Sequence, residues 1–215
     1  MSISESRAFG LRSALTVAAC FAAAAVSAQW APRAPDGHPD LSGTWDNGAG
    51  IDFVQPRKDG ESICIFGCPG GAPPPASIPQ ASVPKYRPEL AARVADLDAR
   101  QVQEDPVLRC FAPGVPRIGP PDKIVQRPGE AVFLYEDVSG SFFRLVPTDG
   151  RPHPTNNEPS FLGDAVGHWE GDTLVVETKN FNDQTWLTDN GAFHTTDLRV
   201  VERLRRTEDK LEWVA

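Results

Sequence analysis

Hydrophobic and polar residues alternate along the second half of the chain with the period of two that is typical of β-strands. The alternating segments follow one another in pairs, with short polar or glycine-containing turns between them, as antiparallel hairpins require. We expect strands at residues 40–45, 123–126, 131–136, 141–146, 165–169, 173–178, 198–204 and 210–214. Because no helical pattern is long enough to connect parallel strands, the sequence predicts an antiparallel meander.

A curled sheet with this many strands closes most simply as a small barrel, whose interior holds side chains or one small ligand. The triplet Gly43-Thr44-Trp45 is similar to the G-x-W that opens lipocalin barrels, which favours a barrel over a sandwich. We therefore predict a mainly β fold with a lipocalin-like barrel over residues 122–215. Its last strand would leave an edge, to be covered by the second subunit of a homodimer or by the region before the barrel.

The region at residues 29–121 is dominated by proline, and we expect it to wrap around the barrel as part of one folded domain that spans residues 29–215. Of the 21 prolines, 16 lie between Pro32 and Pro121, where they cannot donate hydrogen bonds to a sheet. One helix is predicted inside this region, beginning at Pro88-Glu89 and ending at Asp105-Pro106. Leu90, Val94, Leu97 and Gln101 would share one face of this helix.

The first 28 residues have the order of a secretory signal: Arg7 and Arg12, an apolar run, and Val26-Ser27-Ala28 as a cleavage site. The run is shorter than the roughly 20 apolar residues that a membrane helix needs. We expect a cleaved signal peptide over residues 1–28 and a periplasmic or secreted protein without membrane insertion. One alternative is an N-terminal core helix, and another is a lipoprotein attached through Cys20, since Val17-Ala18-Ala19-Cys20 resembles a bacterial lipobox.

The charge of the chain excludes some classes of partner, and its cysteines bear on disulfides and metal sites. The chain has 21 Lys+Arg, 29 Asp+Glu and a formal net charge of −8, which argues against nucleic acid and anionic membranes as partners. After removal of the signal, the cysteines Cys64, Cys68 and Cys110 would remain. In an oxidising compartment we expect two of them to form a disulfide, and the spacing lacks the second pair of ligands that a thiolate metal site needs.

Two motifs carry a resemblance to known proteins. Residues 149–154 read DGRPHP, and residues 167–187 contain GHWEGDTLVVET and NFNDQTWL. These strings resemble an abundant family of exported bacterial proteins of uncharacterised function, and the resemblance covers about residues 35–206. It implies export and brings no established chemistry. The chain departs from the family in its long segment at residues 64–84 and in its shorter C-terminal part.

Glu202 is the first candidate for chemistry, because it falls on a strand face that is otherwise apolar. It alternates with Val200 and Leu204, so its carboxylate is expected to point into the interior. A buried carboxylate must be paired, or its pKa rises until it is neutral, and such a group can act as a general acid or base. The alternative is a buried ion pair between Glu202 and Arg144.

Arg144 and Tyr135 are candidates for binding a substrate. Arg144 shares a strand face with Phe142 and Val146, and an inward guanidinium can hold a carboxylate or phenolate. Tyr135 alternates with Phe133, so we expect its phenol to reach the interior as well.

Two histidines are candidates for proton transfer. His153 lies between Pro152 and Pro154, which restrict the backbone and can aim the imidazole, or it is a loop histidine that bonds nearby carbonyl groups. His194 is expected at the start of the strand that contains Glu202. Because neither H-x-H nor H-E-x-x-H occurs, we expect no metal site.

The motif at residues 182–186 connects two expected strands and contains the last two candidates. Asp183 would act as a base and Trp186 would stack on an aromatic ligand. The alternative is a turn stabilised by the Asn and Asp side chains, with Trp186 covering the core.

Together these residues predict an exported enzyme, a lyase, isomerase or hydrolase that acts on a largely apolar or aromatic small molecule inside the barrel. Its expected catalytic residues are His153, His194, Glu202 and Asp183, and Arg144, Tyr135 and Trp186 are expected to orient the substrate. No nucleotide or metal cofactor is expected. Because a G-x-S-x-G motif, a P-loop and a dinucleotide fingerprint are all lacking, acyl transfer through a nucleophilic serine, phosphoryl transfer and hydride transfer lose their usual support. The alternatives are a non-catalytic periplasmic carrier, or an envelope interaction protein that uses residues 69–84 as its contact surface.

Overall fold

The computed structural model describes residues 31–46, 57–59, 62–64, 84–137, 139–188 and 190–215 of the 215-residue chain. The expected signal peptide, Cys20 and nearly all of the proline-rich segment 69–84 lie outside the described residues. Within them, no helix is both long enough and apolar enough to cross a membrane.

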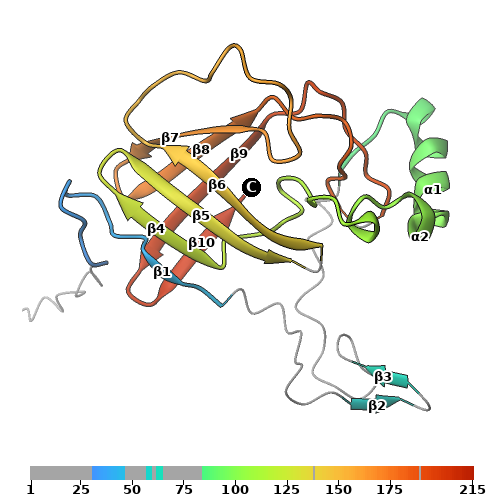
Figure 1. Ribbon diagram of the computed structural model, residues 1–215, viewed down its shortest axis with the longest axis horizontal. Helices are drawn as coiled ribbons and strands as arrows, with labels where there is room; N and C mark the ends of the chain where they lie inside the picture. Colours follow the sequence, from blue (N-terminus) through green and yellow to red (C-terminus); the bar gives the residue numbers. More distant parts are fainter. Residues whose placement is uncertain (1–30, 47–56, 60–61, 65–83, 138, 189) are drawn as a thin grey trace, which may run out of the picture.

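The described strands form two antiparallel four-stranded sheets and one short ribbon (Figure 1). The first sheet has the order β1 (Gly43–Thr44), β4 (Lys123–Arg127), β5 (Glu130–Asp137), β6 (Gly140–Pro147). The second has the order β10 (Lys210–Val214), β9 (Val200–Thr207), β8 (Thr173–Lys179), β7 (Asp164–Glu170). The ribbon pairs β2 (Arg57–Asp59) with β3 (Ser62–Cys64). The predicted mainly β, antiparallel fold is therefore confirmed.

No hydrogen-bonded ladder joins the two sheets in the described part of the chain. In Figure 1 the first sheet lies in front of the second, with β6 beside β7 on one side and β1 and β10 as the edge strands of the other. A long connection, residues 148–163, separates β6 from β7, so no tight turn sets a register between them. A closed lipocalin-like barrel is therefore not found, and that part of the prediction is unconfirmed.

The core lies between the inward faces of the two sheets. Its fully or almost fully buried members are Leu41, Ile124, Ala131, Phe133, Val146, Leu174, Val176 and Leu204. All but Leu41, which precedes β1, occupy inward positions on their strands, as the period of two predicts. One boundary differs from the prediction: β9 begins at Val200 instead of 198, so His194 lies in the preceding loop and not on the strand.

Residues 31–46, which precede β4 in the sequence, contact both sheets. Arg33 pairs with Asp172 in the turn between β7 and β8, at 2.7 Å, and the imidazole of His38 stacks on Trp169 with ring centroids 4.6 Å apart. The Arg206 guanidinium from β9 donates to the Asp40 carbonyl, at 2.6 Å. These contacts tie the N-terminal described segment to the second sheet, while β1 pairs with the first.

The one short helix lies where the sequence predicts it. A 3-10 turn (Pro88–Leu90) leads into α1 (Ala91–Ala99) and α2 (Gln101–Glu104), and a second 3-10 turn (Val107–Arg109) follows. The helix ends before Asp105-Pro106, because proline cannot supply the N–H that a helix interior needs.

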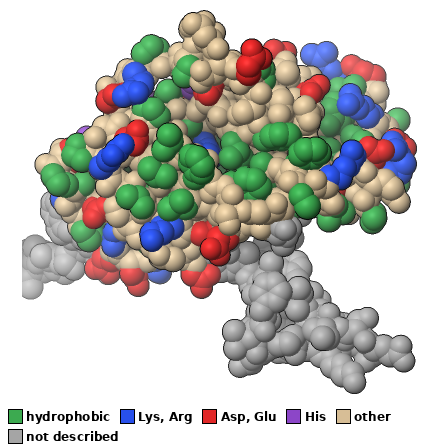
Figure 2. Space-filling view, in the orientation of Figure 1, with side chains coloured by type: hydrophobic (Ala, Val, Ile, Leu, Met, Phe, Trp, Pro, Cys, Tyr) green, Lys and Arg blue, Asp and Glu red, His purple; other side chains and the backbone are tan. Residues whose placement is uncertain are grey.

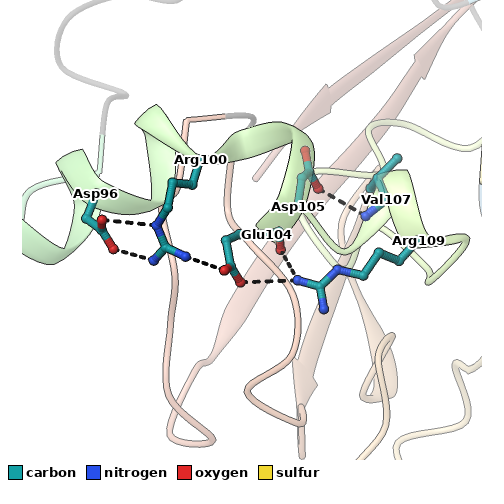
Figure 3. A network of polar contacts seen from close by, with 6 residues as sticks. All are labelled: Asp96, Arg100, Glu104, Asp105, Val107 and Arg109. Carbon is teal, nitrogen blue, oxygen red and sulfur yellow. Dashed lines mark hydrogen bonds and ion pairs between the residues drawn. The ribbon is translucent and has the colours of Figure 1, made fainter.

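A chain of polar contacts lines the exposed side of this helical region (Figure 3). Arg100 lies between Asp96 and Glu104, and Glu104 also contacts Arg109. Exposed pairs of this kind contribute at most about 1 kcal/mol each. Asp105 is different, because it is buried and both of its oxygens contact the Arg117 guanidinium at 2.7 Å. Burial alone would raise the pKa of Asp105, but hydrogen bonds from Arg117 and the Val107 N–H hold it below its usual value.

The predicted disulfide is not seen in the described part of the chain. Cys110 carries a free, exposed thiol and has a left-handed backbone, with φ of 61°. Cys68 and the side chain of Cys64 lie outside the described residues.

Candidate functional site

Five polar side chains meet inside the core, one from each of five strands. Arg144 on β6 forms a bidentate ion pair with Glu202 on β9, with Nη1–Oε1 at 3.0 Å and Nη2–Oε2 at 2.6 Å. Arg144 also donates to the Tyr135 hydroxyl on β5 at 3.0 Å and to Thr178 Oγ1 on β8 at 2.7 Å. The Trp213 indole on β10 donates to Glu202 Oε1 at 3.1 Å. We call this set of residues the core network.

The core network has the arrangement of a buried ion pair with its hydrogen bonds largely satisfied. Arg144 is 4% exposed and Glu202 0%, so water screens their attraction little. Burial opposes the charged guanidinium, but the facing Glu202 carboxylate raises the pKa of Arg144 above its usual value and keeps it charged. Three of the seven predicted site residues are therefore brought together, in the ion-pair arrangement that was the alternative for Glu202.

Burial in the core network raises the pKa of the Tyr135 phenol from 10 to about 12. The native state therefore holds this proton more tightly than the unfolded chain, so its stabilising contribution is complete below about pH 10 and is lost as the pH rises to about 12. A shift of this size corresponds to about 2–3 kcal/mol. We expect the free energy of unfolding, measured with urea, to fall over this alkaline range more steeply in the wild type than in Tyr135→Phe. Equal slopes for the two proteins would contradict the assignment.

A cleft of about 750 Å³ opens between β6 and β7, directly beside the core network. Its walls come from β6, from residues 110–112 and from the loop that precedes β7. The apolar lining residues are Phe111, Ala112, Phe142, Phe143, Leu145, Pro147, Pro154, Phe161, Leu162, Ala165 and Val166. The rings of Phe111 and Phe161 stack with centroids 5.3 Å apart. Arg144 also lines the cleft, and among the described residues its buried Nε has no hydrogen-bond partner. We call this space the β6–β7 cleft.

The apolar wall of the β6–β7 cleft continues onto the outer face of the first sheet. Phe143 and Leu145 are 62% and 53% exposed, and their neighbours on β5 are Leu134 and Val132. Figure 2 shows hydrophobic side chains gathered over this front sheet. Contiguous exposed apolar surface is characteristic of binding sites.

His153 lies in the loop after β6 and faces a carboxylate. Its Nε2 is 3.1 Å from Glu177 Oε1 on β8, while its Nδ1 is buried without a partner among the described residues. Hydrogen bonds from Lys179 and Arg199 lower the pKa of Glu177 to about 2, although partial burial opposes this. Glu177 therefore stays ionised at neutral pH and orients the imidazole. His153 does not contact the β6–β7 cleft directly, but Pro154 beside it lines the wall.

His194 is buried in the loop before β9, and its ring centroid lies 6.1 Å from that of Phe181. Its Nδ1 lies 2.9 Å from the Thr195 carbonyl and its Nε2 lies 2.6 Å from the Thr185 hydroxyl. A carbonyl only accepts, so Nδ1 carries the proton and donates it, and the Thr185 hydroxyl donates to Nε2. Both nitrogens of His194 are thus occupied within the fold.

Asp183 and Trp186 border a separate, smaller cleft of about 220 Å³, next to the helical region. Asp183 is exposed, whereas Trp186 is 5% exposed and packs into the protein. The placement of Trp186 agrees with the alternative in which it covers the core. The structure therefore divides the seven predicted residues among the core network, the His153 loop and the region around His194.

Sequence reasoning missed most of the residues that line the β6–β7 cleft. Phe143 and Leu145 fall on the outward positions of β6, where polar residues are expected, and that mismatch was the available signal. Phe111 and Phe161 lie in loops and gave no periodic pattern. Thr178 and Trp213 complete the core network from inward positions of their strands.

The described residues contain no cluster of three or more His, Cys, Asp or Glu side chains that could hold a metal ion. No protein-family model, no curated protein and no solved structure matches the chain.

Proposed function

We propose that this protein is exported and binds a small, largely apolar molecule with an aromatic ring in the β6–β7 cleft. The observation that carries the proposal is the cleft itself. Its volume of about 750 Å³ is in the range of known small-molecule sites, which is about 300–1,000 Å³. Its lining is mainly apolar and includes four phenylalanines, with a buried cation at its inner end.

Arg144 would make the β6–β7 cleft selective among apolar ligands. The core network already holds the Arg144 guanidinium in one position. Little side-chain conformational entropy is therefore lost when it binds a ligand. Its Nε–H has no acceptor among the described residues and is closed to solvent, so a phenol, carbonyl or carboxylate oxygen of the ligand would reach it after a shift of the lining side chains. The expected ligand therefore combines a flat apolar body with one oxygen acceptor.

We also propose that the two sheets are the walls of a lipocalin-like barrel that is open at this cleft, and that the chain belongs to the exported family that its motifs resemble. The facing inward surfaces of the sheets and the shared core support the first proposal. The basic, apolar and small-residue order at the N-terminus supports export.

Binding is better supported than acid–base catalysis by the placement of the predicted proton-transfer groups. Glu202 is held by Arg144 and Trp213, and His194 uses both of its nitrogens within the fold. Catalysis is kept as a second candidate function because of one observation, the buried and unpartnered Nδ1 of His153 beside the wall of the cleft. In that case Glu177 would orient His153, which would move a proton to or from a bound molecule.

One experiment separates binding from catalysis. The purified protein is incubated with a cell and plant metabolite extract, recovered, and analysed by mass spectrometry beside its His153→Gln variant. A compound retained unchanged by both proteins supports binding. A compound consumed by the wild type and spared by His153→Gln supports catalysis instead, and neither retention nor consumption of any apolar compound would contradict both.

The apolar wall of the cleft is expected to bind an aromatic probe such as anilinonaphthalenesulfonate. Leu145→Ser should weaken probe binding by about 1–2 kcal/mol, which is about 5- to 30-fold, because it removes apolar surface from the site. Probe fluorescence titrated against protein concentration measures the effect.

Val125→Ser is the matched control for this prediction. Val125 is also an exposed apolar residue of the first sheet, at 45% exposure, but it does not line the cleft. Its substitution should leave probe affinity within about twofold, since no contact in the site is lost. Equal losses in both variants would show that the probe binds the open sheet face and not the cleft.

A further inference from the structure

We propose that a second cleft, between the edge strands β1 and β10, receives an extended polypeptide segment that adds a strand beside β10. The segment is expected to have apolar residues at alternate positions and a basic residue near each end. This inference is independent of the ligand proposed for the β6–β7 cleft, because the two clefts share no lining residue. We call this second space the β1–β10 cleft.

The hydrogen-bond pattern of the β9–β10 hairpin leaves main-chain groups of β10 free. Thr207 and Lys210 flank a two-residue turn and form its closing hydrogen-bonded pair. Antiparallel pairs alternate, so Glu212 bonds back to β9 while the N–H and C=O groups of Leu211 and Trp213 point away from it. β10 is the last strand of its sheet, and no other described strand takes up these groups.

On the facing side, the Arg206 side chain partly replaces a strand. The Trp45 N–H donates to the Asp122 carbonyl at 2.7 Å, so the main-chain groups of Ser42 and Thr44 point away from β4. Arg206 Nη1 donates to the Asp40 and Ser42 carbonyls, at 2.6 and 3.2 Å. Arg206 thus satisfies main-chain carbonyl groups at one end of the β1 edge, and the main-chain groups of Thr44 still face the cleft.

The β1–β10 cleft has the size and lining that a strand needs. Its volume is about 760 Å³, and residues of both edge strands line it. The five residues of β10 span about 17 Å at the usual rise of a strand. Trp45, Leu211 and Trp213 form its inner wall, where they pack on the core, so alternate side chains of an added strand would meet an apolar surface.

The charges at the rim of the β1–β10 cleft select the kind of segment. Asp209 and Glu212 line the cleft and have no ion-pair partner among the described residues. The lining cations are Lys210 and Arg206, and Arg206 is engaged by the Asp40 and Ser42 carbonyls. Two free carboxylates beside an apolar wall favour a segment with Lys or Arg next to its apolar residues.

Strand addition explains these features better than pairing with a second copy. Natural proteins cover, charge or disrupt exposed strand edges, and β10 carries Lys210 and Glu212 but has neither a proline nor a bulge that would stop a strand from pairing. Two copies joined through β10 would satisfy that edge but would leave the tryptophan-lined cleft and the β1 edge unfilled. A separate segment lying in the cleft would satisfy both edges at once.

The test uses the purified protein and a synthetic peptide with alternating valine and threonine and a lysine at each end. Binding is followed by calorimetry, and amide hydrogen exchange is followed by NMR. We expect the amides of Leu211 and Trp213 to exchange rapidly in the free protein and to slow by about tenfold or more with peptide. The same peptide with N-methylated valines cannot donate main-chain hydrogen bonds and should bind about tenfold more weakly or not at all.

Three variants make the test specific. Leu211→Pro removes the N–H that points into the cleft, a substitution that edge strands tolerate, and it should abolish binding while Leu211→Val retains it. Glu212→Lys should weaken binding of the lysine-ended peptide and strengthen binding of a glutamate-ended one. A thermal unfolding curve for each variant establishes that it is folded.

Three results would overturn the proposal. The first is equal binding of the methylated and unmethylated peptides, and the second is binding that leaves exchange at Leu211 and Trp213 unchanged. The third is a dimer in sedimentation whose Leu211 and Trp213 amides are already protected without peptide, which would assign the β10 edge to a second copy.

Discussion

Glu202→Leu is expected to lower the free energy of unfolding by about 3–5 kcal/mol, because it leaves the Arg144 guanidinium buried without its counterion. Arg144→Met should cost a similar amount by leaving Glu202 unpaired. The double variant should be within about 1–2 kcal/mol of the wild type, since an apolar pair of similar volume avoids the cost of desolvating two charges. Urea unfolding of all four proteins measures this cycle.

The Arg203–Glu170 pair is the control for that cycle. Its two side chains are about half exposed, at 50% and 48%, so removal of either should change the free energy of unfolding by less than about 1 kcal/mol. A loss for Glu202→Leu as small as this control would contradict a buried ion pair. A loss for the double variant equal to the sum of the single losses would show that Arg144 and Glu202 act separately.

Gly163→Ala is expected to cost about 2–4 kcal/mol and to weaken probe binding in the β6–β7 cleft. Gly163 lines that cleft and has φ of +65°, a conformation that costs an L-residue about 1–2 kcal/mol. A Cβ at this position would also lie 2.5 Å from the Lys179 carbonyl oxygen, and backbone cannot yield as a flexible side chain does. The loop that forms one wall of the cleft would have to move away from β8.

Gly150→Ala carries only the conformational part of this effect, so its comparison with Gly163→Ala gives the steric part. Gly150 has a similar φ of +79°, but no atom lies within 4 Å of a Cβ built there. It should lose only the conformational cost of about 1–2 kcal/mol and retain probe binding. Urea unfolding and probe titration of both variants provide the comparison. If the two glycines behaved alike, the close approach of Gly163 to β8 would not matter for the cleft.

Local pattern was sufficient to predict the strands of the two sheets, the helix and the direction of the core side chains, but it missed the β2–β3 ribbon. Arg144, Glu202 and Tyr135 were expected to point inward, because each alternates with apolar residues on its strand. They do meet in the core network. The outward phenylalanine and leucine of β6 broke the same rule, and they line the β6–β7 cleft.

Side-chain periodicity could not place the predicted site residues that lie in loops. His153, His194 and Asp183 lie in segments without periodicity, so nothing in the sequence indicated which elements they would face. The structure gives His153 a carboxylate partner 24 residues away and encloses His194 between a threonine and a carbonyl. The predicted acid–base site required these three residues and Glu202 at one place, and the fold divides them among the core network, the His153 loop and the region around His194.

The sequence by itself determined the antiparallel hairpins, the single helix and which strand positions face inward, because turn chemistry and side-chain period act between near neighbours. Only the tertiary structure decided that the sheets would leave a cleft beside β6 and another between β1 and β10. Those spaces depend on how two sheets joined by a long connection pack against each other. Packing between segments many residues apart is set by the summed fit of the core, and no local pattern specifies it.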